Sequence, residues 1–180
     1  MKKLVQLLGL RAYQHLDGYM ERWWLVEAAA DKTRKAMRLH HVLRSDLDRA
    51  LHDHPWDNAS LLLRGGYWEV VPGAYREAFE NGIETASHPM RQLHVTIHNL
   101  RGGKVSPLQR EVFAAAGVRW RGPMSFTRRR AEDLHRLVLP AGATAWSLFV
   151  TWPKRREWGF ATREGWVHNV AYLAALGRDV

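Results

Sequence analysis

The chain of 180 residues contains no cysteine. Disulfides, thiolate metal sites and cysteine nucleophiles are therefore all excluded. Any transition-metal site must instead use histidine, aspartate or glutamate ligands. The lack of cysteine also fits a reducing compartment, and we expect a cytoplasmic protein.

Long hydrophobic runs are also missing, and none approaches the roughly 20 residues needed to cross a bilayer. The stretch from Leu4 to Leu10 is short, is interrupted by Gln6 and has no small-residue cleavage site after it, so we predict neither a signal peptide nor a membrane partner. The chain has no glycine-rich nucleotide loop and no serine in a nucleophile-elbow context. Nucleotide-dependent transfer and a hydrolytic triad are therefore not supported.

Positive charge is abundant, with 27 lysines and arginines against 18 acidic residues and a net charge of +9. This balance favours acidic partners. The basic residues are scattered, and the densest groups, 128–130 and 154–156, lie beside strand-like segments. We interpret them as a solvated surface and expect a small anionic ligand, with nucleic acid the less favoured partner.

Short apolar runs alternate with turn residues along most of the chain, which favours an all-β barrel or double-sheet sandwich. We expect one domain over 1–180. Residues 74–123 are interpreted as an insertion on the barrel, because their apolar content is too thin for a separate core. The expected strands cover 22–28, 35–43, 59–64, 67–71, 93–98, 126–139 and 144–151; the expected helices cover 2–10, 107–116 and 170–176, and the early turns 30–33 and 44–48.

The motif with the clearest chemistry is His52-Asp53-His54, placed on a strand that Pro55 bends or ends. Side chains two apart on a strand share one face, so both imidazoles could hold the same ion. Another histidine, His135, lies far downstream in the expected strand 126–139. We predict that these three histidines meet around one metal inside the barrel.

The other histidine pairs are weaker candidates. His40 and His41 are adjacent and face opposite sides of a strand, so only one of them could line the pocket. His94 and His98 share a face of the expected strand 93–98, and we place them on the surface. The Gly65-Gly66 pair is interpreted as a hairpin turn.

These motifs resemble those of the cupin superfamily, whose members are small jelly-roll barrels. His52-Asp53-His54 with the following glycine pair is similar to the first cupin motif, and His135 to the histidine of the second. The sequence around these motifs is similar to cupin-like proteins of bacteriophages and bacteria. The similar segments include LHDHPWD, LLLRGGYWE and KRREWGF. The resemblance covers most of residues 20–167 and implies a cupin-like jelly-roll β-barrel with short flanking helices.

Two departures from the cupin pattern affect the ligand set. The usual acidic position is occupied by Asn58 or Ala59, so Asp57 or Glu69 would have to replace it. Asp57 suits a capping role equally well, and Glu69 better suits a strand surface. The Pro-x-Gly that usually precedes the second-motif histidine is also absent. A site with three histidines and no carboxylate would resemble that of thiol dioxygenases, which are also cupins.

The resemblance implies a metal-dependent dioxygenase or another small-molecule-modifying enzyme. Fe(II) is the favoured ion, with Mn, Ni or Zn as alternatives. Two other hypotheses are a non-catalytic, metal-stabilised binding module associated with phage, and a metal-free epimerase-like cupin that uses Tyr67 and a histidine. The oligomeric state is left open; the resemblance implies that a homodimer could form through sheet edges, as cupins often do. The expected substrate-binding residues are Arg64, Tyr67, Arg130 and Trp56.

Overall fold

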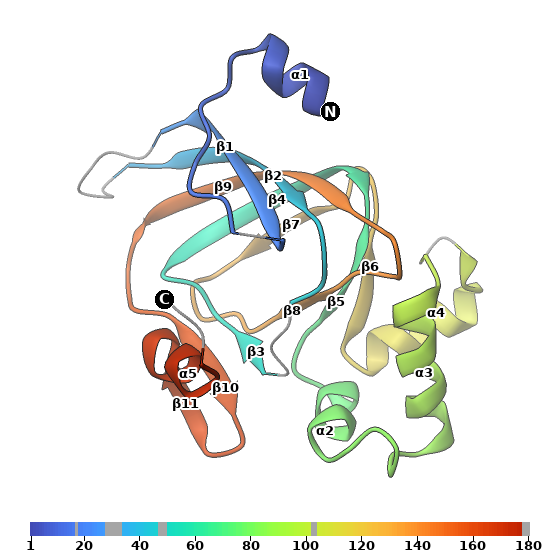
Figure 1. Ribbon diagram of the computed structural model, residues 1–180. Helices are drawn as coiled ribbons and strands as arrows, with labels where there is room; N and C mark the ends of the chain where they lie inside the picture. Colours follow the sequence, from blue (N-terminus) through green and yellow to red (C-terminus); the bar gives the residue numbers. More distant parts are fainter. Residues whose placement is uncertain (17, 28–33, 47–49, 102–103, 178–180) are drawn as a thin grey trace.

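The computed structural model describes residues 1–180 except 17, 28–33, 47–49, 102–103 and 178–180. Its strands form three antiparallel sheets that together close into a barrel (Figure 1). The largest sheet has the order β1 (Met20–Val26), β2 (Ala36–Val42), β9 (Ala145–Lys154), β4 (Trp56–Gly65) and β7 (Phe126–Arg129). The two smaller sheets are β6 (Val118–Arg121), β5 (Tyr67–Val70) and β8 (Arg136–Val138), and β11 (Gly165–His168), β10 (Gly159–Thr162) and β3 (Leu51–His52). The predicted β-barrel is confirmed.

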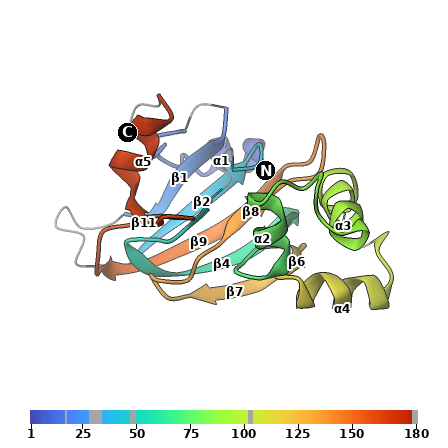
Figure 2. The same cartoon turned by 90° about the horizontal axis from the view of Figure 1, so that it is seen from below.

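The helices lie on the outside of this barrel (Figure 2). They are α1 (Lys2–Leu7), α2 (Ala74–Glu80), α3 (His88–Asn99), α4 (Pro107–Ala115) and α5 (Asn169–Ala175). Three of them, α2 to α4, fall between β5 and β6 and lie together on one side, while α5 lies at the other (Figure 2). The expected turn over 30–33 and part of that over 44–48 lie outside the described residues.

The start of α4 is the helix boundary that the sequence predicts most clearly. Ser106 Oγ accepts a hydrogen bond from Gln109 N at 3.2 Å, and Gln109 Oε1 accepts one from Ser106 N at 2.8 Å. Pro107 occupies the first helical position. This reciprocal capping box satisfies two backbone donors that the helix itself cannot pair, so the predicted helix is confirmed. For α5 the cap differs from expectation, because His168 and not Asn169 accepts from the backbone of Val170.

The expected strand over 93–98 is wrong, because these residues lie within helix α3. Alternating apolar residues at 93, 95 and 97 suggested a strand. In the structure Leu93 and Ile97 are buried, while Val95 is exposed. The side chains that pack are therefore four residues apart, which is helical spacing. They pack with Trp68 from β5 and Phe113 from α4 in one core cluster.

The glycine pair also has a different role from the one expected. β4 pairs with β7 and β9, whereas β5 pairs with β6 and β8, so the chain changes sheet at Gly65 and Gly66 and makes no hairpin there. Gly65 has φ +75°, and a Cβ at this position would lie 1.9 Å from the carbonyl oxygen of Thr144. Glycine is therefore needed for this corner to form against the neighbouring chain.

The expected strand over 126–139 is two strands, β7 and β8, in different sheets. Between them the chain turns at Arg130, whose backbone N donates to Asp133 Oδ2 at 2.8 Å. Aspartate commonly stabilises turns through such local bonds. His135 follows this turn and precedes β8, so it reaches the barrel from a loop end and not from mid-strand.

Alternation along the strands separates an outer face from an inner one. On β2, Leu39 and His41 face outward, where Leu39 packs in a cluster with Trp23 and Trp146, and His41 stacks on Trp146. The inner face of the large sheet carries buried polar side chains on β2, β4, β7 and β9: Arg38, His40, Asn58, Ser60, Arg129, Ser147 and Thr151. A barrel interior this polar needs partners for its hydrogen-bonding groups, and it is the setting for the site described next.

Candidate metal centre

The backbone around the three predicted histidines is tied together by main-chain hydrogen bonds. His52 N donates to His135 O, and His135 N donates to His52 O, both at 3.0 Å. His54 N donates to Ala131 O at 3.0 Å. Asp53 points away from its two neighbours, and its carboxylate accepts from Gly159 N at 2.6 Å and from Trp166 Nε1 at 2.8 Å. It thereby anchors the β10–β11 hairpin beside the site.

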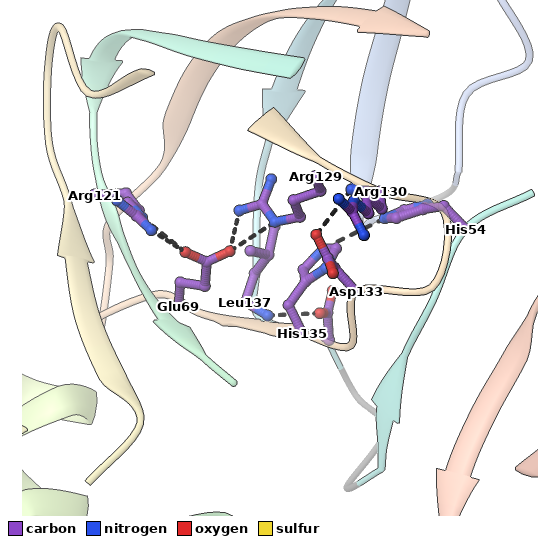
Figure 3. Close-up of polar contacts among 9 residues, drawn as sticks. His54, Glu69, Arg121, Arg129, Arg130, Asp133, His135 and Leu137 are labelled. Carbon is purple, nitrogen blue, oxygen red and sulfur yellow. Dashed lines mark hydrogen bonds and ion pairs between the residues drawn. The ribbon is translucent and has the colours of Figure 1, made fainter. Parts of the chain in front are cut away.

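These bonds bring the imidazoles of His52, His54 and His135 into one cluster, as predicted. One ring nitrogen from each lies within 4.8 Å of the others. His54 Nε2 and His135 Nε2 are 3.4 Å apart (Figure 3), within hydrogen-bond distance for neutral rings. Two nitrogens bound to one ion at about 2.1 Å each would lie about 3.0–3.4 Å apart. His54 and His135 are thus already at the spacing of two ligands of one ion, while the His52 nitrogen, within 4.8 Å of both, would have to move closer to join them.

His54 and His135 are held in the neutral form that binds metals. Burial lowers the pKa of His54 well below its ordinary value, and the charges of His52 and Arg129 add to the effect. Burial, followed by the charges of Arg129 and His52, lowers the pKa of His135 in the same way. At neutral pH neither nitrogen has to lose a proton before it can coordinate an ion.

Asp46 lies near the site but was not predicted from the sequence, because residues 44–48 were interpreted only as a turn. Its buried carboxylate lies 3.8 Å from His52 Nδ1 and accepts from Leu137 N at 2.7 Å and from the Tyr19 hydroxyl. A carboxylate behind a histidine fixes the ring orientation and directs the other nitrogen toward a metal. Asp46 lies on this side of the His52 ring and is not a ligand, but at 3.8 Å it makes no hydrogen bond to the ring.

Glu69 was expected on a strand surface, and this is wrong. Its side chain is buried and accepts from Arg121 Nε at 2.7 Å and from Arg129 Nε at 2.8 Å (Figure 3). Burial alone would raise the pKa of Glu69, but the charges of Arg129 and then Arg121 lower it below its ordinary value. The carboxylate is thus ionised, and it neutralises the arginine charge nearest His54 and His135.

Asp57 is not brought to the histidine cluster. Its Oδ1 accepts from Ala131 N at 2.9 Å and from Arg155, so it holds the corner after His54 in place. Among the described residues, the group that could hold an ion contains the three histidines alone. Trp56, one residue earlier, lies near the inner face, with its ring centroid 5.3 Å from Arg38 Cζ.

The other expected substrate-binding residues are dispersed. Tyr67 is buried in the barrel core, where its hydroxyl is hydrogen bonded to Ser60. Arg130 is exposed. Arg64 is also exposed and lies on the outer face, in a groove of about 730 Å³ that it shares with Lys2 and His41. Its β4 position pairs with Trp146, which packs outside the barrel.

His40 is the member of the His40–His41 pair that faces inward. It is buried, its ring stacks on Phe149 at 4.8 Å between centroids, and its Nε2 has no hydrogen-bond partner. Phe149 also lies 6.3 Å from the ring of His54. The wall of the candidate metal centre therefore continues along β2 and β9.

Several solved structures are similar to this chain over most of its length. A cupin-2 domain protein from Rhodospirillum rubrum is 14% identical, with a TM-score of 0.47, 92% of this chain covered and 80% of that one. A cupin-2 barrel protein from Rhodopseudomonas palustris is 12% identical, with a TM-score of 0.45 and coverages of 92% and 83%. A polyketide cyclase from Streptomyces resistomycificus is 15% identical, with a TM-score of 0.46 and coverages of 83% and 77%.

No protein-family model and no curated protein sequence matches the chain. Within the part of the chain that the structure describes, no helix is both long enough and apolar enough to cross a membrane.

Proposed function

We propose that this protein is a metal-dependent enzyme that modifies a small molecule inside its barrel. The observation that carries the proposal is the cluster of His52, His54 and His135, with three ring nitrogens within 4.8 Å. Two of these imidazoles are held neutral by burial. Three neutral imidazoles accept several divalent ions. We take Fe(II) as the favoured ion because of the resemblance to cupin dioxygenases, with Mn, Ni and Zn as alternatives.

An open coordination sphere supports catalysis over a purely structural site. Structural ions are enclosed by four protein ligands, whereas catalytic ions keep a position for substrate or water. In the described ranges no carboxylate joins the three histidines, since Asp57 and Glu69 are engaged by arginines. A divalent ion held there would supply Lewis acidity or oxygen activation.

The protein side chains have separate tasks in this proposal. The Glu69 carboxylate offsets the positive charge of Arg129 that would otherwise oppose a bound cation. Phe149 and Trp56 present aromatic surface that limits water. The homodimer, the phage association, the cytoplasmic location and the weaker nucleic-acid hypothesis stay predictions.

The test is metal content after chelation and reloading with Fe(II), Mn(II), Ni(II) or Zn(II), measured by elemental mass spectrometry. We expect about one ion per chain in the wild type and none in the His52→Ala/His54→Ala double variant. The matched control is His94→Gln/His98→Gln, which removes another histidine pair, on α3 outside the barrel, and should bind like the wild type. Ion retained in the His52→Ala/His54→Ala variant, or absent from every protein, would disprove the proposal.

A further inference from the structure

Arg38 is a buried cation, and no carboxylate of the described residues pairs with it. It lies on the inner face of β2 and is 4% exposed. Its Nη2 donates to Thr151 Oγ1 at 3.1 Å, while its Nε has no hydrogen-bond partner. No ion pair joins Arg38 to any carboxylate in the described residues. Burial lowers the pKa of Arg38 to about 10, so the guanidinium stays charged at neutral pH.

Aromatic rings surround this guanidinium. Its Cζ lies 5.0–5.8 Å from the centroids of four rings: Tyr13, Trp24, Trp56 and Phe149. Ring faces attract a cation, but they accept no hydrogen bonds from the edge of its plane. The rings therefore hold Arg38 in position and leave its in-plane donors available for an anion.

A second arginine strengthens the demand for an anion. Arg22 pairs in register with His40 on β2, and its guanidinium lies 4.6 Å from the ring of Tyr13, which Arg38 also contacts. The Arg22 side chain donates to the backbone carbonyl of Gln14 and has no carboxylate partner in the described part of the chain. Two like charges meeting on one wall raise the free energy of the empty site, and a bound anion would lower it.

The position of Arg38 connects it to the candidate metal centre. Phe149 lies 5.8 Å from Arg38 Cζ and 6.3 Å from the ring of His54, so a single aromatic side chain separates the two. His40, two residues along β2, faces the same interior. A small molecule whose acid group bonded to Arg38 would place its remaining atoms toward the histidines.

We propose that Arg38 is the anchor for the carboxylate group of a small organic acid, which is the substrate class of this enzyme. The inference rests on the proposed metal-dependent function. A carboxylate fits better than a phosphate, because Arg38 offers one planar fork beside the Thr151 hydroxyl, which matches two oxygens, while the Arg22 side chain is engaged by the Gln14 carbonyl. A phosphate dianion with three terminal oxygens would require more donors than this wall offers.

The experiment is isothermal titration calorimetry with benzoate, malonate and 2-oxoglutarate, beside benzamide and inorganic phosphate. Each is titrated into metal-free and metal-loaded protein. We expect at least one carboxylate to bind the wild type, and benzamide not to bind. In Arg38→Met the affinity should fall about 10- to 100-fold, the range for a lost charge-assisted bond. Arg38→Lys keeps the charge but not the fork, and it should bind more weakly than the wild type and more tightly than Arg38→Met.

Arg64→Gln is the matched control, because it removes one arginine from the same sheet on the outer face, and it should bind like the wild type. Circular dichroism of every variant verifies the fold. The inference is overturned if none of the three carboxylates binds, if Arg38→Met binds like the wild type, or if phosphate binds through Arg38 more tightly than the carboxylates.

Metal content of the same samples separates this inference from the proposed function. Wild-type protein that holds an ion but binds carboxylates independently of Arg38 overturns the anchor alone. Protein that binds no ion, but binds a carboxylate through Arg38, overturns the metal chemistry and retains the anchor in a binding module.

Discussion

Arg129 and Arg38 both lie inside the barrel, but their guanidinium groups have different surroundings. Arg129 meets the Glu69 carboxylate, which neutralises its charge, and the more exposed Arg121 contacts the same carboxylate from the other side. Arg38 meets four aromatic rings and one hydroxyl, and no carboxylate among the described residues. A buried charge that the fold has neutralised contributes to structure, whereas one left without a counter-ion is suited to bind something else.

The largest effect that follows from this comparison is on stability. Glu69→Gln would leave Arg129 buried without its carboxylate, and we expect the free energy of unfolding to fall by about 3–5 kcal/mol. Chemical denaturation measures this change. Glu132→Gln is the control, because it removes an exposed carboxylate that also contacts an arginine, and it should cost less than about 1 kcal/mol. A similar loss of unfolding free energy in both variants would show that the buried ion pair contributes no more to stability than the exposed one.

The same ion pair should make stability depend on pH. The folded-state pKa of Glu69 is lowered below its ordinary value of 4.5, so its contribution is present above that pH. It is lost as the pH falls further and the carboxylate gains a proton in the folded state, with a slope of at most about 1.4 kcal/mol per pH unit. The difference in unfolding free energy between wild type and Glu69→Gln should therefore shrink below pH 4.5. A difference that stays constant down to pH 3 would contradict this.

A smaller effect is expected at the outer partner of Glu69. The Arg121 side chain is 21% exposed, whereas that of Arg129 is 7% exposed. Arg121→Gln should lower the free energy of unfolding by about 1–2 kcal/mol, because Glu69 keeps its deeper partner. Thermal and chemical denaturation measure this loss. If Arg121→Gln were as destabilising as Glu69→Gln, the predicted order of the two variants would be wrong.

The smallest change is expected at Arg38. Arg38→Met removes an uncompensated charge as well as favourable ring contacts and one hydrogen bond, so the two effects nearly offset. Without ligand we expect a change of less than about 1 kcal/mol in either direction by chemical denaturation. A destabilisation of 3 kcal/mol would place Arg38 with Arg129 as a structural arginine.

The sequence predicted the parts of the fold and site that depend on local rules. Spacing of two placed His52 and His54 together, and the capping box placed α4. The site residues that were missed depend on which strands lie side by side. Glu69 became a buried ion-pair partner only because β5 and β7 face one interior, and Asp46 is held in place by a hydrogen bond from the backbone of Leu137 in β8.

Arg38 had a local signal that went unused. If His40 lines the interior, strand alternation places the residue two before it on the same face. The exposed Arg64 and Arg130 were preferred because they lie near the motifs in sequence. Distance along the chain was a poor guide here, since the anchor residue comes from β2, which pairs with β9 and β1 and not with β3.

The reciprocal backbone bonds between His52 and His135 have an evolutionary consequence. They involve only main-chain atoms, so they do not depend on which side chains these two positions carry. A lineage could exchange either imidazole for another residue and still inherit the same closed barrel. Selection on the chemistry of this site can therefore act almost independently of selection on folding.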